Sequence, residues 1–455
     1  MNSGDTAWVL TSAALVLLMT PGLALFYGGM VRSKSVLNMM MMSFGAIGVV
    51  GVLWTLYGYS MAFGNDVGGG LLGSPTEFFG LSSLMGTNGL DNGFASDDVV
   101  FTVPSMAFVA FQAVFAIITV ALISGAIADR AKFGTWLIFT GVWATLVYFP
   151  VAHWVFAFDG AESAAGGWIA NKLLAVDFAG GTAVHINAGA AGLALAIVLG
   201  KRVGWQRDPM RPHSLPLVMI GAGLLWFGWF GFNAGSALAA NGQAAEVFVN
   251  TLVATCAAML GWLVTEKVRD GRATSLGGAS GVVAGLVAIT PSCSAVSPLG
   301  AIALGAVAGV LCALAVGLKY RFGFDDSLDV VGVHLVGGVV GTIAVGFVGT
   351  AAATAGVDGL LYGGGVDQLW RQSVGAGAVL VYSFVLTYVI GYVLQKTVGF
   401  RLDEEDEVVG IDAAAHAESA YDFHQAFGGV RAMPAADTAR PAVSSDVEKK
   451  ESVEA

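Results

Sequence analysis

The chain has 455 residues, of which 56% are hydrophobic and 12% are charged, and its formal net charge at pH 7 is −11. Soluble globular proteins average about 25% charged residues, so this composition excludes a soluble protein and indicates an integral membrane protein. We expect no nucleic-acid partner. The three cysteines form no CxxC pair, so we expect neither a disulfide framework nor a metal centre, and no other cofactor.

Apolar runs of about 20 residues predict an all-α, multi-pass fold with eleven transmembrane helices. The first run begins without the basic segment of a signal peptide. The expected helices lie near residues 6–30, 40–63, 101–129, 135–157, 179–200, 215–238, 247–266, 276–291, 299–318, 329–351 and 373–396.

The distribution of basic residues predicts the orientation in the cell membrane. With the N-terminus outside, only Lys172 and Arg371 of the 21 basic residues face outward, and the rest lie in cytoplasmic loops or the tail. This bias follows the rule that cytoplasmic loops carry the excess of Lys and Arg. We therefore predict a transmembrane domain at 1–398 and a cytoplasmic tail at 399–455.

Two histidines lie inside apolar segments in the same local setting. Asp177 precedes His185 in DFAGGTAVH, and Asp326 precedes His334 in DDSLDVVGVH. The two histidines fall on the fifth and tenth helices, and units of five helices insert in opposite directions. This predicts inverted repeats at about 1–200 and 215–351, followed by the eleventh helix at 373–396.

Both histidines are expected near the middle of the membrane. Eight residues of helix span about 12 Å, in a hydrocarbon core of about 30 Å. Such a pair could line a polar route and share a proton, because each neutral imidazole offers one donor and one acceptor. A purely structural role remains the alternative. Metal binding by the pair is the weaker hypothesis, because no third ligand is placed at that depth.

Aromatic residues accompany the pair. The segment LLWFGWFGFNAGSA contains Trp229 and Phe232 and ends near Ser236, and AFVAFQAVFA contains Phe111. Aromatic faces attract cations, so these residues favour a cation entry site, although core packing is the commoner role of such a stripe.

The chain resembles the ammonium transporters of the Amt/MEP/Rh family. The resemblance is carried by PGLALFYGGMVRSKS, DFAGGTAVHINAG, GWFGFNAGSA, GLVAITP and GVHLVGG, and it covers nearly all of residues 1–423 in order. It implies an eleven-helix unit with a pseudo-twofold axis, assembled as a homotrimer with one pore per subunit.

The resemblance also implies roles for individual residues. Phe111 and Phe232 would stack as a gate, Ser236 would help to hold ammonium in an outer vestibule, Asp177 would support this recruitment region, and His185 and His334 would line the pore. The family's AHxVW motif reads AHWVF here, which puts Phe156 where a Trp closes the vestibule, with Trp154 or Trp168 as possible substitutes.

The expected activity is that of a transporter and not of an enzyme. Ammonium would lose a proton near the Phe gate and cross as ammonia, because an apolar pore gives an ion no counter-charge. Potassium has no proton to lose and would be rejected. The alternatives are an ammonium sensor and a channel for another small neutral solute.

The tail has two parts. Residues 399–423 resemble the cytoplasmic region of the family, with Gly410, Asp412, His416, Glu418 and Tyr421 in the expected order, which implies shut-off by a P-II-type nitrogen regulator. The alternative is that this part only holds the trimer together. Beyond about residue 429 the composition predicts disorder.

Overall fold

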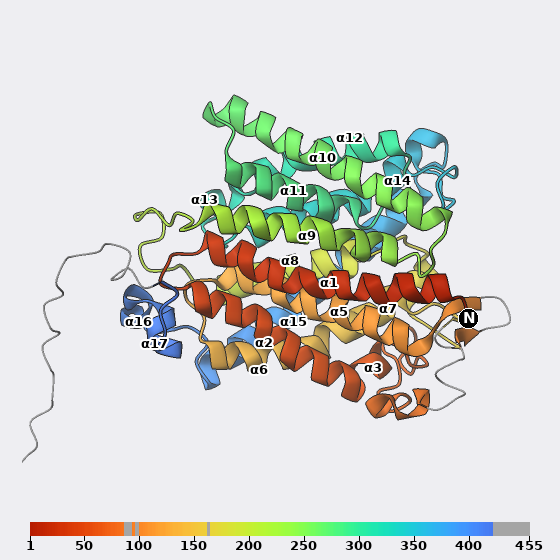
Figure 1. Ribbon diagram of the computed structural model, residues 1–455, viewed down its shortest axis with the longest axis horizontal. Coiled ribbons are helices and arrows are strands. Elements are labelled where there is room, and N and C mark those ends of the chain that lie inside the picture. The colour runs from red at the N-terminus through yellow and green to blue at the C-terminus, as the bar shows by residue number, and fades with distance from the viewer. Residues whose placement is uncertain (86–92, 96–99, 162–163, 422–455) are drawn as a thin grey trace, which may run out of the picture. The chain divides into compact units, whose positions relative to one another are not determined.

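The computed structural model describes residues 1–85, 93–95, 100–161 and 164–421. Residues 1–420 form one compact unit, and residues 421–455 form a second, of which only Tyr421 is described. Figure 1 shows the long helices of the first unit running roughly alongside one another.

In the described chain, ten helices are long and apolar enough to cross a membrane, and one apolar helix is shorter. Together they match the eleven predicted segments, so the predicted all-helical, multi-pass fold is confirmed. They are Ser3–Met30, Val36–Phe63, Ser105–Ile127, Phe133–Phe156, Gly181–Leu199, Leu215–Gly235, Gly242–Asp270, the shorter Ser275–Ile289, Pro298–Phe322, Val331–Val348 and Asp367–Thr397. The inverted repeats and the orientation in the membrane stay predictions.

Several of these segments change helix type along their length. Their α-helical parts are α1 (Ser3–Met30), α2 (Val36–Leu53), α3 (Tyr59–Phe63), α5 (Ser105–Ile123), α6 (Phe133–Trp143), α7 (Phe149–Phe156), α8 (Asn187–Leu199), α9 (Leu215–Gly235), α10 (Gly242–Asp270), α11 (Ser275–Ile289), α12 (Pro298–Ala315), α13 (Leu318–Phe322), α14 (Val336–Val348) and α15 (Asp367–Thr397). The π-helical turns are η1 (Trp54–Gly58), η4 (Ala144–Tyr148), η5 (Ile169–Leu173), η6 (Gly181–Ile186) and η7 (Val331–Leu335). Such turns are rare and occur frequently at functional sites.

Smaller elements complete the unit. They are the 3₁₀ turns η2 (Phe79–Leu84), η3 (Ser124–Ile127) and η8 (Leu360–Tyr362), the strands β1 (Gly93–Ala95) and β2 (Val100–Pro104), and the tail helices α16 (Glu404–Val409) and α17 (Ile411–His416). The two strands pair antiparallel. The helix predicted from residue 101 begins only at Ser105, because residues 100–104 form β2 and Pro104 disfavours the helical conformation in Val103 before it.

Helices α1 and α9 pack along one another and join the two halves of the chain (Figure 1). Glycines make this contact close. A Cβ atom at Gly221 would lie 2.3 Å from the backbone nitrogen of Phe26, and one at Gly29 would lie 2.7 Å from the carbonyl oxygen of Ser214. The high glycine content thus serves packing, as expected for helices with no hydrophobic drive between them.

The crossing of α10 and α12 is tighter still. A Cβ atom at Gly305 would lie 2.1 Å from the carbonyl oxygen of Ala254, and one at Gly309 would lie 2.1 Å from that of Ala258. Each helix thus contributes two small residues four apart, which lets the backbones touch. No side chain can be added there without moving one helix.

We therefore expect Gly309→Val to separate α10 from α12. Overpacking of this kind costs about 1–3 kcal/mol or more, and the melting temperature of the purified protein should fall accordingly. Gly377→Ala is the matched control, because nothing lies within 4 Å of a Cβ atom at that helical position. Equal melting temperatures for the two variants would contradict the close crossing.

Candidate functional site

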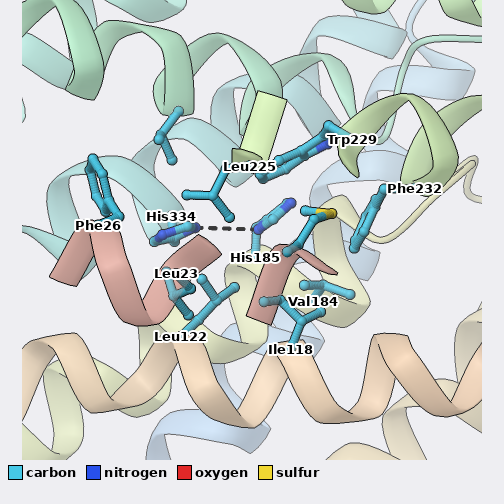
Figure 2. A pocket seen from close by; sticks show the side chains of 12 residues that line it. Leu23, Phe26, Ile118, Leu122, Val184, His185, Leu225, Trp229, Phe232 and His334 are labelled. Carbon is cyan, nitrogen blue, oxygen red and sulfur yellow. Dashed lines mark hydrogen bonds between the residues drawn. The ribbon is translucent and has the colours of Figure 1, made fainter. Parts of the chain in front are cut away.

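The two histidines predicted to meet are in contact. His334 Nδ1 lies 3.4 Å from His185 Nδ1, and the ring centroids are 5.4 Å apart with an interplanar angle of 25°. Both side chains are buried, with 1% and 3% of their surface exposed. Figure 2 shows the two rings pointing toward each other between apolar side chains. The sequence prediction that distant segments bring them together is confirmed.

Each histidine lies in a π-helical turn that starts next to an aspartate. The carboxylate of Asp177 accepts the backbone N–H groups of Gly180, Gly181, Thr182 and Ala183, and the Thr182 hydroxyl as well. Asp326 caps the helix that carries His334 in the same way, because its carboxylate accepts the backbone N–H groups of Val330 and Val331. An acid at a helix start satisfies N–H groups that have no partner within the helix.

This geometry corrects the predicted helical spacing of eight residues. Gly180 has a φ of 117°, and the helix begins only at Gly181. The stretch after Asp177 is therefore a turn, and His185 lies in the second turn of its helix. The aspartates set where the helices start, and so they set where the histidines lie.

The histidines line a narrow cavity that we call the histidine space. Its volume is about 10 Å³, close to what a single water molecule needs. The other lining residues carry no charged side chain: they are Met19, Leu23, Phe26, Ile118, Leu122, Val184, Leu225, Trp229, Phe232 and Val283. His185 Nε2 has no hydrogen-bond partner among the described residues. A small polar molecule in this space would therefore find one unused imidazole nitrogen.

Trp229 belongs to the histidine space and not to a separate entry site. Its ring stacks on His185 with centroids 5.4 Å apart and an interplanar angle of 19°. Its Nε1 donates to Thr290 Oγ1 at 2.9 Å, which fixes the orientation of the indole. The entry-site role that the aromatic stripe suggested for Trp229 is not what its position supports.

A much larger cavity, which we call the aromatic chamber, lies beyond Phe232. Its volume is about 540 Å³. Its wall includes four of the predicted site residues, namely Phe111, Phe156, Asp177 and Ser236. Ser236 Oγ donates to the carbonyl oxygen of Phe232 at 2.8 Å. The chamber thus brings together four of the residues that the resemblance singled out.

The ring in contact with Phe232 is that of Phe115, and not the predicted Phe111. The centroids of Phe115 and Phe232 are 4.2 Å apart, and those of Phe111 and Phe115 are 4.9 Å apart. Phe111 and Phe115 are four residues apart on α5, so they occupy the same helix face at successive depths. Phe115 lines the aromatic chamber and Phe232 lines the histidine space, so these two rings in contact separate the two cavities.

Phe156 itself lines the aromatic chamber, together with Phe158. The suggested substitutes are engaged elsewhere. Trp154 Nε1 donates to the carbonyl oxygen of Leu71 at 2.8 Å, and its ring packs on Tyr382 and Trp168. Neither Trp154 nor Trp168 is among the lining residues, so phenylalanine takes the place of the expected tryptophan.

A third space continues from the opposite side of His334. It shares Phe26, Val283 and His334 with the histidine space and ends at Tyr27, Ser280 and Asp329. Asp329 is paired with Lys319, whose Nζ lies 2.6 Å from the carboxylate. Burial raises the pKa of the neighbouring Asp326, and the positive charge of Lys319 opposes this shift. The three cavities follow one another from Asp177 to Asp329.

The tail helices dock on the loop between α1 and α2. The carboxylate of Asp412 accepts the backbone N–H groups of Leu37 and Asn38 at 3.0 and 2.9 Å. Ser35, the residue at the start of α2, makes no side-chain cap there. Asp412 therefore supplies the cap that α2 lacks.

Three of the other predicted tail residues lie in the first unit, and the fourth lies in the second. His416 Nε2 lies 3.1 Å from Asn38 Oδ1, and a Cβ atom at Gly410 would clash with Lys34 at 2.7 Å. Glu418 contributes its backbone N–H to the carbonyl oxygen of Asp412. Tyr421 belongs to the second unit.

A buried ionic cluster beneath the tail was not anticipated from the sequence. Arg202 binds Asp325 through two nitrogens at 2.9 Å and Asp129 at 3.1 Å. Glu407 of α16 is fully buried and accepts the N–H of Val203 and a bond from Arg401. Burial opposes ionisation of Asp325, but the hydrogen bonds from Arg202 and the positive charges of Arg130 and Arg202 together outweigh burial and lower the pKa of that carboxyl. Burial also lowers the pKa of Arg130 to about 10.

Comparison with known proteins gives a consistent result. A family model described as Ammonium Transporter Family matches residues 7–421. The chain is 65% identical to the ammonium transporter of Mycobacterium tuberculosis (strain ATCC 25618 / H37Rv), over 94% of this chain and 92% of the relative. It is 46% identical to that of Bacillus subtilis (strain 168), over 92% of this chain and 99% of the relative.

Solved structures agree with the sequence relatives. Saccharomyces cerevisiae Mep2 superposes with a TM-score of 0.78 at 33% identity, covering 89% of this chain and 91% of that one. A structure described as "Sensor Amt Protein" superposes with a TM-score of 0.80 at 29% identity, covering 91% and 98%.

The capping of the histidine-bearing helix by Asp177 can be tested without any transport assay. Asp177→Ala leaves several buried N–H groups without an acceptor, at a cost of about 1–3 kcal/mol, so the melting temperature should fall. Asp177→Asn keeps one acceptor oxygen, so its melting temperature should fall less. The exposed Glu405→Ala is the control, and a similar small effect from all three would contradict the capping role.

Proposed function

The chain belongs to the ammonium transporter family, and from this membership we propose that it moves ammonium nitrogen across the membrane as neutral ammonia. The route would run from the aromatic chamber, past Phe115 and Phe232, through the histidine space to the space at Asp329. The observation that carries the proposal is the histidine space itself, which is narrow, buried and free of charged lining residues.

The size and lining of the histidine space decide which form of the substrate can pass. An ion there would lose its water and meet no counter-charge, which costs many kcal/mol. Ammonia is neutral and about as large as the one water molecule that fits. We infer that ammonium gives up a proton before it enters.

The aromatic chamber is suited to collecting the cation. Helices α7 and α9 end there, at Phe156 and next to Ser236, and η5 ends beside Leu174. The C-terminal end of a helix carries a partial negative charge. The starts of η6 and α10 bring the opposite charge, but the side chains of Asp177 and Asn241 cap them. Phenylalanine faces add cation–π attraction.

The histidine pair would hold ammonia by hydrogen bonds. The contact between the two Nδ1 atoms requires that one donates and the other accepts, and the ring that accepts then carries its proton on Nε2. If His185 accepts, its free Nε2 donates to ammonia, and if it donates, its Nε2 accepts from ammonia. The pair thus offers a polar contact in either tautomer without carrying a net charge.

This mechanism rejects potassium for a chemical reason. Potassium has the charge of ammonium and can enter the aromatic chamber, but it has no proton to leave behind. Potassium would therefore stop at the rings of Phe115 and Phe232. Two alternatives stay open for this chain, a sensor with little flux and a channel for another neutral solute, and measured ammonium flux with competition by other solutes decides between them.

We expect His185→Ala to impair transport and selectivity together. The substitution removes hydrogen bonds worth about 1–2 kcal/mol, which corresponds to a loss of about fivefold to thirtyfold in methylammonium uptake into reconstituted vesicles. It also opens space for water, so potassium should begin to compete.

His213→Ala is the matched control, because this histidine lies outside the three cavities and binds the carbonyl oxygen of Val31. Unchanged selectivity against potassium in His185→Ala would remove the histidine pair from the mechanism.

The tail contact supports a regulatory role, as the family resemblance implies. Asp412 caps α2 and Glu407 enters the ionic cluster, so the position of the tail is coupled to the membrane helices. We propose that a P-II-type regulator acts through this contact, that the subunit works as a homotrimer, and that the tail lies in the cytoplasm.

We predict that Asp412→Ala and deletion of residues 399–455 change methylammonium uptake in the same direction, because both remove the cap of α2. Loss of a helix cap costs about 1 kcal/mol, so Asp412→Ala should still assemble normally. Native mass measurement of the assembly checks this. Dissociation of the assembly by the deletion, with normal uptake in Asp412→Ala, would instead show that the tail only joins subunits.

A further inference from the structure

The aromatic chamber is far larger than its proposed cargo requires. A water-sized molecule needs about 10–15 Å³ of space, whereas the chamber provides about 540 Å³. Cavities of about 300–1,000 Å³ are typical sites for organic ligands. Only part of the chamber would be filled by an ammonium ion.

The wall of the chamber has the composition of a site for organic cations. Aromatic rings form much of it, and the phenylalanines are Phe108, Phe111, Phe115, Phe156, Phe158 and Phe178. Its one charged lining residue in the described chain is Asp177, an acid. Aromatic cages of this kind recognise methylated ammonium groups, whose charge is spread over apolar methyl surfaces.

The exit from the chamber is closed to such a ligand. The rings of Phe115 and Phe232 are in contact, with centroids 4.2 Å apart, and the histidine space behind them has a volume of about 10 Å³. A quaternary ammonium has no proton to release, and it is several times larger than that space. It could enter the chamber and could not leave by the pore.

We propose that the aromatic chamber binds bulky alkylammonium cations, of the size of choline or tetramethylammonium, as ligands that compete with ammonium and are not transported. This rests on the proposed function, because competition requires that ammonium use the same chamber.

The test compares choline with 3,3-dimethyl-1-butanol, a neutral molecule of the same shape. Choline should raise the melting temperature of the purified protein and competitively inhibit methylammonium uptake by cells, and the neutral alcohol should do neither. Radiolabelled choline should not enter the cells through the protein. Equal effects of the two compounds would overturn the proposal.

Three variants locate the site. Phe156→Ala should weaken choline binding by about threefold to thirtyfold, the range expected for loss of one cation–π contact. Phe156→Trp should strengthen it, because Trp is the better cation–π partner. Phe227→Ala should change nothing, because that ring lies on α9 outside the chamber and is 57% exposed.

The outcomes separate this inference from the proposed function. Normal methylammonium uptake with no effect of choline on uptake or melting temperature overturns only the choline site. Absence of methylammonium uptake in the unaltered protein overturns the proposed function, and a choline-dependent melting temperature would then still report binding to the chamber.

Discussion

The contact between His185 and His334 is the interaction on which the proposed route depends. Two imidazoles 3.4 Å apart in an apolar interior need both rings held in place, because neither has a charged partner there. The restraint comes from the backbone. Asp177 and Asp326 accept the first N–H groups of the two π-helical turns and so fix where each helix begins. Stacking of Trp229 on His185 then fixes one ring plane.

Close helix packing makes this arrangement possible. The histidines come from segments 149 residues apart in the chain, so the helices that carry them must approach without intervening side chains. A Cβ atom at Gly189 would lie 2.5 Å from the backbone nitrogen of Leu335, directly next to His334. Glycine at such a position lowers the helix propensity of its own segment, but it lets two helix backbones touch. In lipid, this close packing is a main source of helix association.

The tail is held by the same kind of interaction as the histidine-bearing helices, namely carboxylates that accept backbone N–H groups. Its carboxylates, Glu407 and Asp412, satisfy backbone donors of segments that belong to the membrane helices and their loops. Buried charges of this kind are costly unless they are fully paired, and loss of one partner is strongly destabilising. Displacement of the tail would separate these carboxylates from their partners. The tail contact is therefore suited to regulation by a second protein that moves the tail.

The sequence by itself determined the features that follow from local composition. Apolar run length defined the eleven helices, and the repeated Asp to Val-His pattern identified the two histidines, because hydrophobic length and an ionisable group in an apolar segment are readable one residue at a time. Tertiary structure decided which side chains meet. Phe115 rather than Phe111 contacts Phe232, Trp229 stacks on His185, and Glu407 enters an ionic cluster. These pairings depend on the rotation and depth of each helix relative to its neighbours, which the sequence of a single segment does not contain.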